Sequence, residues 1–327
     1  MVLHRLLLAL LARPVAPLNP LGANVDASFD YSRTLAFADV MKQARPFGSA
    51  PAPWDGNCST HPDGWPSQSD FGVVFATLGA SRVADPNGVD LSGVWRLSFS
   101  GACASVAPAA SGGAFTVTGV AYAPAADLTT ASLNYNPSAT TSQIMLAFRG
   151  CATRARGAGA ANISLLQPGH APTDVFSRPL LALLRGFDVL RFMDQGASPP
   201  PISSWGDRTL PCAPSYAARG TGLPWEVLVE LAVAVNVSQL WVNVPAHADD
   251  DYIGQLGALL AGAAPPSTAI LVEYGNVSFD ANHPCAPATP PRKKHTLTRT
   301  LHPLNPTKSG ALEFSIRIHA VQPAHGE

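Results

Sequence analysis

The chain has 327 residues, a formal net charge of −1 at pH 7 and only 13% charged residues. A charge balance this close to zero gives no attraction to nucleic acid or to an anionic membrane surface, so we expect neither as a partner. The hydrophobic fraction of 46% is sufficient for packed cores and excludes a chain that is disordered throughout. The length allows about two domains.

Residues 1–16 predict a signal peptide. The chain begins Met-Val-Leu-His-Arg, continues with an apolar run over 6–12 and then reaches Arg13-Pro14. A basic start before a short apolar stretch is typical of a secretory signal, and the run is far shorter than the about 20 apolar residues that span a bilayer. We therefore expect a secreted protein, or one in the endomembrane lumen, without a transmembrane segment. A wrongly assigned start of translation is the alternative.

The cysteines and sequons agree with an oxidising compartment. None of the five cysteines forms a CxxC pair, so we expect no structural metal site, and one or two disulfides whose pairing stays open. They are Cys58, Cys103, Cys151, Cys212 and Cys285. Four Asn-x-Ser sequons predict a glycoprotein. They are Asn57, Asn162, Asn236 and Asn276.

The first half of the chain changes character at residue 71. Residues 17–70 predict a first strand, a helix over 34–43 and an extended loop over 46–70 that is rich in Pro, Gly, Ser and Asp. Residues 71–166 contain short alternating runs, such as 72–78 and 94–99, separated by Gly, Pro and Asn. Such runs are typical of a small antiparallel β domain.

The second half predicts alternating helices and strands over residues 167–285. Helices are expected at 175–184, 225–235 and 252–260, and strands at 187–193, 240–244 and 268–274. This alternation indicates parallel β/α units. Residues 286–327 form a tail rich in proline and basic residues, with one alternating stretch at 312–318 that predicts a strand.

Eight short motifs follow one another along residues 20–280. They are LGANVD (from Leu21), FADVMKQARPF (from Phe37), DGWP (from Asp63), LRFMD (from Leu190), WGDR (from Trp205), LPWEVLVELA (from Leu223), LWVNVPAHADDDYI (from Leu240) and ILVEYGN (from Ile270). In this order they resemble a largely uncharacterised secreted family with a clan-A-type glycoside hydrolase barrel and an inserted β-rich domain. The resemblance implies an α/β fold: a partial TIM-type (β/α) barrel of about the first four units with a small antiparallel β domain inserted.

The resemblance also places the expected chemistry at the carboxyl ends of the strands. Hydrolysis of a glycosidic bond normally needs two carboxylates, one of them a general acid/base. In the family the fourth strand ends in a pattern like Glu-Tyr-Ser-Asn-Glu, whereas residues 273–277 read Glu-Tyr-Gly-Asn-Val. Asn276 is retained, but Val277 occupies the acid/base position and cannot donate a proton. No late strand supplies a second carboxylate, so whether the chain is an enzyme stays open.

Three explanations of Val277 are open. The coding sequence is misread after about residue 277, the protein is a degenerate paralogue and thus a pseudoenzyme, or Glu273 or Asp280 acts in an unforeseen way. A half-barrel would also expose a strand edge, through which the chain could self-associate.

Five residues are candidates for substrate binding, because each lies at or after the end of a predicted strand or in the loop that follows. They are Arg191, Asp194, Trp205, His247 and Asn276. Arg191 matches the second-strand arginine that contacts a catalytic carboxylate in clan-A barrels; alternatively it pairs with Asp194 or a neighbouring acid. Asp194 either contacts a sugar hydroxyl or caps a turn.

Each of the remaining candidates also has a structural alternative. His247 precedes Asp249–Asp251, which suggests a sugar or metal site or, more simply, a helix cap. Trp205, Trp225 and Trp241 could stack on sugars or pack in the core, and core packing is favoured for Trp241. Glu273 lies inside a strand, which favours a structural role over a catalytic one.

The sequence predicts a glycoside-hydrolase-like extracellular protein, acting on a polysaccharide if the full barrel exists, with catalysis impaired in this chain. The alternatives are a non-catalytic glycan-binding or cell-surface protein that uses its β-rich domain, and a fragment without independent function. The chain has no GxSxG elbow, no GxGxxG and no P-loop, so neither a serine hydrolase nor a nucleotide cofactor is expected, and we expect no bound metal.

Overall fold

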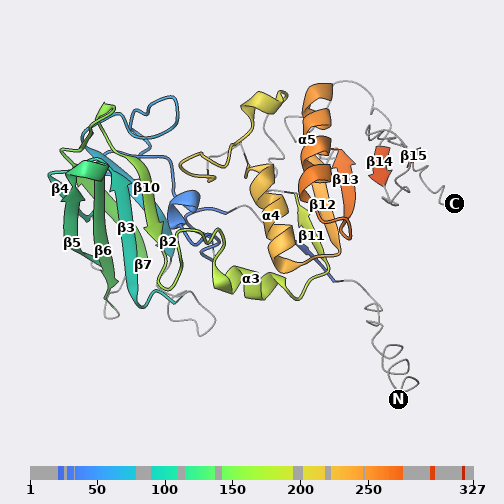
Figure 1. Ribbon diagram of the computed structural model, residues 1–327, viewed down its shortest axis with the longest axis horizontal. Helices are drawn as coiled ribbons and strands as arrows, with labels where there is room; N and C mark the ends of the chain where they lie inside the picture. Colours follow the sequence, from blue (N-terminus) through green and yellow to red (C-terminus); the bar gives the residue numbers. More distant parts are fainter. Residues whose placement is uncertain are drawn as a thin grey trace, which may run out of the picture.

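The computed structural model describes residues 21–25, 28–32, 34–78, 90–109, 115–136, 142–193, 202–217, 222–245, 247–274, 295–298 and 319–320. These residues form two groups of elements. An antiparallel β-sandwich lies beside a mostly parallel sheet that is packed against helices (Figure 1). The chain enters the sandwich after the first strand of the parallel sheet and returns to the second strand of that sheet.

The sandwich is built from two antiparallel sheets. One has the order β2-β7-β4 and the other the order β10-β3-β6-β5. Their bounds are β2 Phe71–Leu78, β3 Val94–Ser100, β4 Ser105–Pro108, β5 Phe115–Ala123, β6 Leu128–Tyr135, β7 Ser142–Arg149 and β10 Ala161–Leu166. The short elements η2 Pro124–Ala126, β8 Ala152–Thr153 and β9 Gly157–Ala158 lie in the connections.

Alternating side chains hold the two sheets together. In β3, Trp95, Leu97 and Phe99 are buried, while the residues between them point outward. Phe99 meets Phe148 of the opposite sheet edge-on, with ring centroids 5.5 Å apart. A disulfide joins Cys103 to Cys151, which settles a pairing that the sequence left open.

The parallel sheet contains four strands that are neighbours in chain order. They are β1 Gly22–Asn24, β11 Val189–Phe192, β12 Gln239–Val244 and β13 Ala269–Tyr274, and each pairs in parallel with the next. The strands β14 His295–Thr298 and β15 His319–Ala320 extend it antiparallel. Whether these strands belong to a barrel, and whether the chain associates through the edge strand β1, stay predictions.

Three helices cover one face of this sheet. They are α3 Arg178–Leu184, α4 Trp225–Val235 and α5 Asp250–Ala263. Their buried side chains form one core with Leu190, Phe192, Leu240 and Val242, which are alternate residues of β11 and β12. Figure 1 shows α4 and α5 in front of the strands. Side chains of the intervening strand residues therefore point to the other face.

The helix predicted over 34–43 is wrong for most of its length. Only the short 3₁₀ helix η1 Val40–Gln43 forms, capped by the Asp39 carboxylate. The preceding residues are extended and make isolated antiparallel bridges, Phe37 with Phe176 and Asp39 with Leu166. Leu35, Ala36, Phe37 and Ala38 are all buried, so this segment meets neighbours on every side and cannot present the single apolar face of a surface helix.

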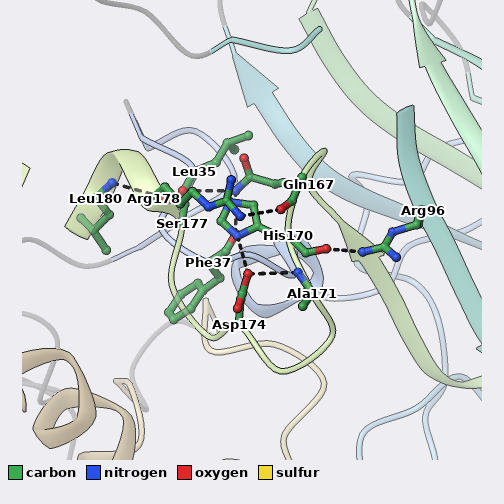
Figure 2. A network of polar contacts seen from close by, with 11 residues as sticks. Leu35, Phe37, Arg96, Gln167, His170, Ala171, Asp174, Ser177, Arg178 and Leu180 are labelled. Atoms are coloured by element: carbon green, nitrogen blue, oxygen red, sulfur yellow. Dashed lines mark hydrogen bonds and ion pairs between the residues drawn. The ribbon is translucent and has the colours of Figure 1, made fainter. Parts of the chain in front are cut away.

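Gln167 ties together the two chain segments that connect the sandwich to the parallel sheet (Figure 2). Its buried side-chain amide donates to the carbonyl oxygen of Phe37 at 2.7 Å and to that of Leu35 at 3.4 Å. Its backbone N–H donates to the carbonyl oxygen of Ala38. One residue of the returning segment therefore satisfies three carbonyl groups of the outgoing segment.

The turn after Gln167 is held from both sides. Arg96 of β3 donates to the carbonyl oxygen of His170, and Arg178 of α3 donates to the carbonyl oxygen of Gly169 at 2.8 Å. The His170 ring is buried, with its Nδ1 3.1 Å from the Asp174 carboxylate (Figure 2). Hydrogen bonds to the backbone N–H of Ala171 and to His170 lower the pKa of Asp174.

We expect Gln167→Leu to lower the free energy of unfolding by about 1–3 kcal/mol, because it leaves buried carbonyl oxygens of the outgoing segment without their donor. Urea unfolding measures the change. The matched control is Gln68→Leu, where the side chain makes only a surface hydrogen bond to Ser59 and the expected change is within about 0.5 kcal/mol. Equal losses in the two variants would contradict this account of the junction.

Candidate functional site

Four side chains from three adjacent strands lie on the sheet face opposite the helices. Arg191 of β11 is in register with Trp241 of β12, and Asn243 of β12 is in register with Glu273 of β13. Trp241 and Asn243 are two residues apart, so all four point to the same face. Arg191, Asn243 and Glu273 are each the penultimate residue of their strand, so the cluster lies at the carboxyl ends of the parallel strands.

The other three side chains converge on one oxygen atom of Glu273. Its Oε2 accepts from Nη2 of Arg191 at 2.9 Å, from the indole Nε1 of Trp241 at 3.1 Å and from the amide Nδ2 of Asn243 at 2.8 Å. The Oε1 atom accepts none of these bonds. Asn243 is fully buried, while the side chains of Arg191 and Glu273 are 22% and 35% exposed. The Glu273 side chain is thus held at Oε2 and remains partly exposed.

Arg191 is held by more than its ion pair. Its guanidinium carbon lies 4.8 Å from the centroid of the Trp241 ring, and its Nη1 lies 3.2 Å from the sulfur of Met193. Arg191 pairs with a neighbouring acid, and that acid is Glu273. Whether Arg191 also contacts a substrate stays a prediction. Asp194, the other named partner, lies outside the described residues.

The segment after β11 carries Trp205, in the 3₁₀ helix η3 Trp205–Asp207. The guanidinium carbon of Arg208 lies 3.9 Å from the centroid of the Trp205 ring, and Nη2 of Arg208 donates to Glu226 of α4 at 2.7 Å. Tyr252 of α5 meets the same ring edge-on at 5.1 Å. One face of Trp205 is therefore covered, which leaves at most the other face for a sugar ring.

Trp225 is not a stacking platform. It is only 1% exposed, and its indole N–H donates to the Tyr252 hydroxyl at 2.7 Å inside the helix-side core. Trp241, for which core packing was favoured, is instead half-buried on the open face and serves as a donor to Glu273. The three tryptophans thus have three different environments.

Lys42 holds residues 211–213, which belong to the segment that follows β11. Its Nζ donates to the carbonyl oxygens of Ala213 at 2.8 Å and Pro211 at 3.3 Å, and Ser215 donates to the carbonyl oxygen of Ala44. Burial lowers the pKa of Lys42, against the opposing effect of the Asp39 carboxylate. The segment is therefore anchored to η1 at one end and to α4 at the other.

His247 is exposed in the turn that follows β12. The helix-cap interpretation of the acidic run after it is confirmed for Asp249, whose Oδ1 accepts from the backbone N–H of Tyr252 at 2.7 Å at the start of α5. Asp250 and Asp251 lie in the first turn of that helix, where negative charge is favoured. The predictions for Asp194, Asn276, Val277 and Asp280 lie outside the described residues.

Asn243 is the site residue that the sequence interpretation missed. It interrupts the apolar run Leu240–Val244, and it is two residues from Trp241, so the two side chains share a face of the strand. A buried amide in such a strand needs a polar partner, which could have pointed to a neighbouring strand. The partner itself was not visible, because the register with β13 sets it.

Three of the four sequon asparagines lie at exposed positions, namely Asn57, Asn162 and Asn236. Asn236 caps the carboxyl end of α4 in a left-handed conformation and precedes β12. It therefore lies near the amino ends of the parallel strands, at the opposite end from Glu273. Asn276 lies outside the described residues.

Comparisons of the chain with protein-family models, curated proteins and solved structures found no match. Within the described ranges, no group of three or more His, Cys, Asp or Glu side chains gathers where it could hold a metal ion. None of the described helices is long and apolar enough to cross a membrane.

We expect Tyr252→Phe to lower the free energy of unfolding by about 1–2 kcal/mol, because it leaves the buried indole N–H of Trp225 without an acceptor. Thermal or urea unfolding measures this. Tyr122→Phe is the control, since it removes an equivalent hydroxyl that bonds Asp127 at the surface, and a change within about 0.5 kcal/mol is expected. A Tyr252→Phe variant with an unchanged free energy of unfolding would show that this bond does not help to order the residues around Trp205.

Proposed function

We propose that this is a glycoside-hydrolase-like extracellular protein that binds glycan at the Glu273 cluster and lacks the usual hydrolytic carboxylate pair. The observation that carries the proposal is the convergence of Arg191, Trp241 and Asn243 on Glu273. The cluster lies on an open sheet face at the carboxyl ends of parallel strands, where (β/α) proteins place their ligands.

The side chains of the cluster suit a polyhydroxylated ligand. Sugars present hydroxyl groups that donate to carboxylate oxygens and accept from amide and guanidinium N–H groups. Because Oε2 of Glu273 is already engaged, Oε1 is the atom that can accept a ligand hydroxyl. The order of the strands supports the partial barrel that the proposal assumes, because neighbours in chain order with helices on one face are what consecutive (β/α) units produce.

Paired-carboxylate hydrolysis has no support on the described part of this face. The two catalytic carboxyl groups lie about 5 Å apart in retaining enzymes and about 6.5–9.5 Å apart in inverting ones. Glu273 is the only carboxylate among the described residues of β1, β11, β12 and β13 that point to this side. Glu273 is moreover bound to Arg191, and Val277 stands where the resemblance places the acid/base.

We expect the full chain to bind β-linked polysaccharides on a glycan array and to release no reducing sugar from them. Arg191→Ala and Glu273→Ala should each lower the signal at least about tenfold, because each removes a charged partner from the cluster. Glu230→Ala, on an exposed position of α4, is the control and should bind like the wild type. Release of reducing sugar that depends on Glu273 would show that the protein is an enzyme.

A second candidate is glycan binding by the sandwich. The outward face of its four-stranded sheet carries hydroxyl and amide side chains that alternate with buried residues. They are Ser98, Thr116, Thr118, Thr130, Ser132 and Asn134. An array signal that survives Arg191→Ala and an Asn276 variant would favour this face over the Glu273 cluster.

The secretory route is supported by the disulfide and by the exposed sequons. When the chain is produced through the secretory pathway, we expect N-glycosidase to reduce its mass, and Asn57→Gln, Asn162→Gln and Asn236→Gln together to remove most of that shift. Cys58 and Cys212 should react with an alkylating agent before reduction, and Cys103 and Cys151 only after it. An unglycosylated secreted chain with four reactive thiols at these positions would contradict the proposal.

A further inference from the structure

We propose that the exposed indole ring of Trp54 packs against the first sugar of an N-linked glycan carried by Asn57. The inference rests on the proposed function in one respect, since it assumes that the sequon at Asn57 is glycosylated. It goes further by giving that glycan a defined binding site on the protein surface. It does not depend on any ligand of the Glu273 cluster.

Trp54 is a large apolar side chain on a firmly supported loop. Its exposed fraction is 49%, whereas the preceding residue, Pro53, is buried. A side chain at Gly72 of β2 would place its Cβ 2.7 Å from the Cα of Pro53, so the loop lies directly on that strand. A sugar that covers the Trp54 ring would remove apolar surface from water, which is favourable.

The Asp55 carboxylate holds the loop that carries Trp54 and Asn57. Its Oδ1 accepts from the backbone N–H groups of Ser49 and Asn57, both at 2.8 Å, and its Oδ2 accepts from the Ser49 hydroxyl at 2.6 Å. The Ser49 hydroxyl and then these backbone N–H groups lower the pKa of Asp55 to about 2. The carboxylate therefore stays ionised, and its hydrogen bonds are kept, at the pH of the secretory pathway.

The two side chains are close enough in the chain for a single sugar to join them. The backbone N–H of Asp55 donates to the carbonyl oxygen of Ala52 at 3.0 Å, and that of Asn57 donates to the Asp55 side chain, so two successive turns contain this segment. Trp54 and Asn57 are three positions apart, which is at most about 10 Å even in a fully extended chain. Asn57 is exposed, while its neighbour Cys58 packs against the sandwich core.

The chemistry of the two partners also matches. A pyranose ring presents C–H groups on one face, and the first sugar of an N-linked glycan carries an acetamido methyl group. The face of an indole ring is negative and attracts such C–H groups. The other described sequons have no ring at the corresponding place, because Asn162 follows Gly-Ala-Ala and Asn236 follows Val-Ala-Val. They are therefore controls within the same chain.

The test uses the full chain from a eukaryotic secretory host, with each glycan trimmed to a single isotope-labelled N-acetylglucosamine. The acetamido methyl signal of the sugar on Asn57, assigned by its loss in Asn57→Gln, should lie upfield of those from Asn162 and Asn236, because the indole ring current shields it. Trp54→Ala should remove this shift. Trp54→Tyr keeps a planar ring and should preserve part of it.

A second measurement follows the release of untrimmed glycans from the native protein by N-glycosidase. Release from Asn57 should become about two- to tenfold faster in Trp54→Ala, in line with the loss of one ring contact, and release from Asn162 should not change.

The possible outcomes separate this inference from the proposed function. An unshifted signal at a glycosylated Asn57 would overturn the inference and leave the proposed glycosylation intact. A secreted chain without glycan at Asn57 would overturn both, whereas glycan binding at the Glu273 cluster would remain a separate result. A ring-current shift that survives Trp54→Ala would show that another residue holds the sugar and would also overturn the inference.

Discussion

The structure depends on how the chain passes between its two groups of elements. Because the sandwich lies between β1 and β11, which are adjacent strands, the outgoing and returning segments must run side by side. Extended backbone with unpaired carbonyl groups would be unfavourable at such a buried crossing. The side chain of Gln167 and the bridges from Phe37 and Asp39 meet this requirement. The crossing thus connects the sandwich to two strands that pair in parallel with one another.

Elements with strong local signals were predictable from the sequence. The helix over 225–235 has the same bounds as α4, because its apolar spacing runs from a proline at its start to an asparagine that adopts the left-handed conformation at its end. The strands predicted at 240–244 and 268–274 agree with β12 and β13 within one residue. Here propensity, pattern and tertiary packing all favour the same structure.

Features that depend on contacts distant in sequence were not predictable. The spacing of Leu35, Phe37, Val40 and Met41 resembles that of a helix, but the first part of this segment is extended because it is enclosed by the returning chain. Glu273 was recognised as a residue within a strand, yet its three donors come from two other strands. The partner of Arg191 was left open, because only the register of β11, β12 and β13 brings Arg191 close to Glu273.

The close approach of Asp39 and Leu166 has a consequence for how such a molecule can be assembled. Both ends of the sandwich lie side by side, as the two ends of an inserted domain do. Domains whose ends are adjacent can be inserted or removed with little disturbance to the host. A chain in which a short turn replaces residues 40–165 would retain the connection between β1 and β11, but it would lose the contacts of Lys42 and Ala44 with the segment after β11. The place of the sandwich in the chain therefore allows its insertion or removal, while the contacts beside η1 still tie the junction to the segment after β11.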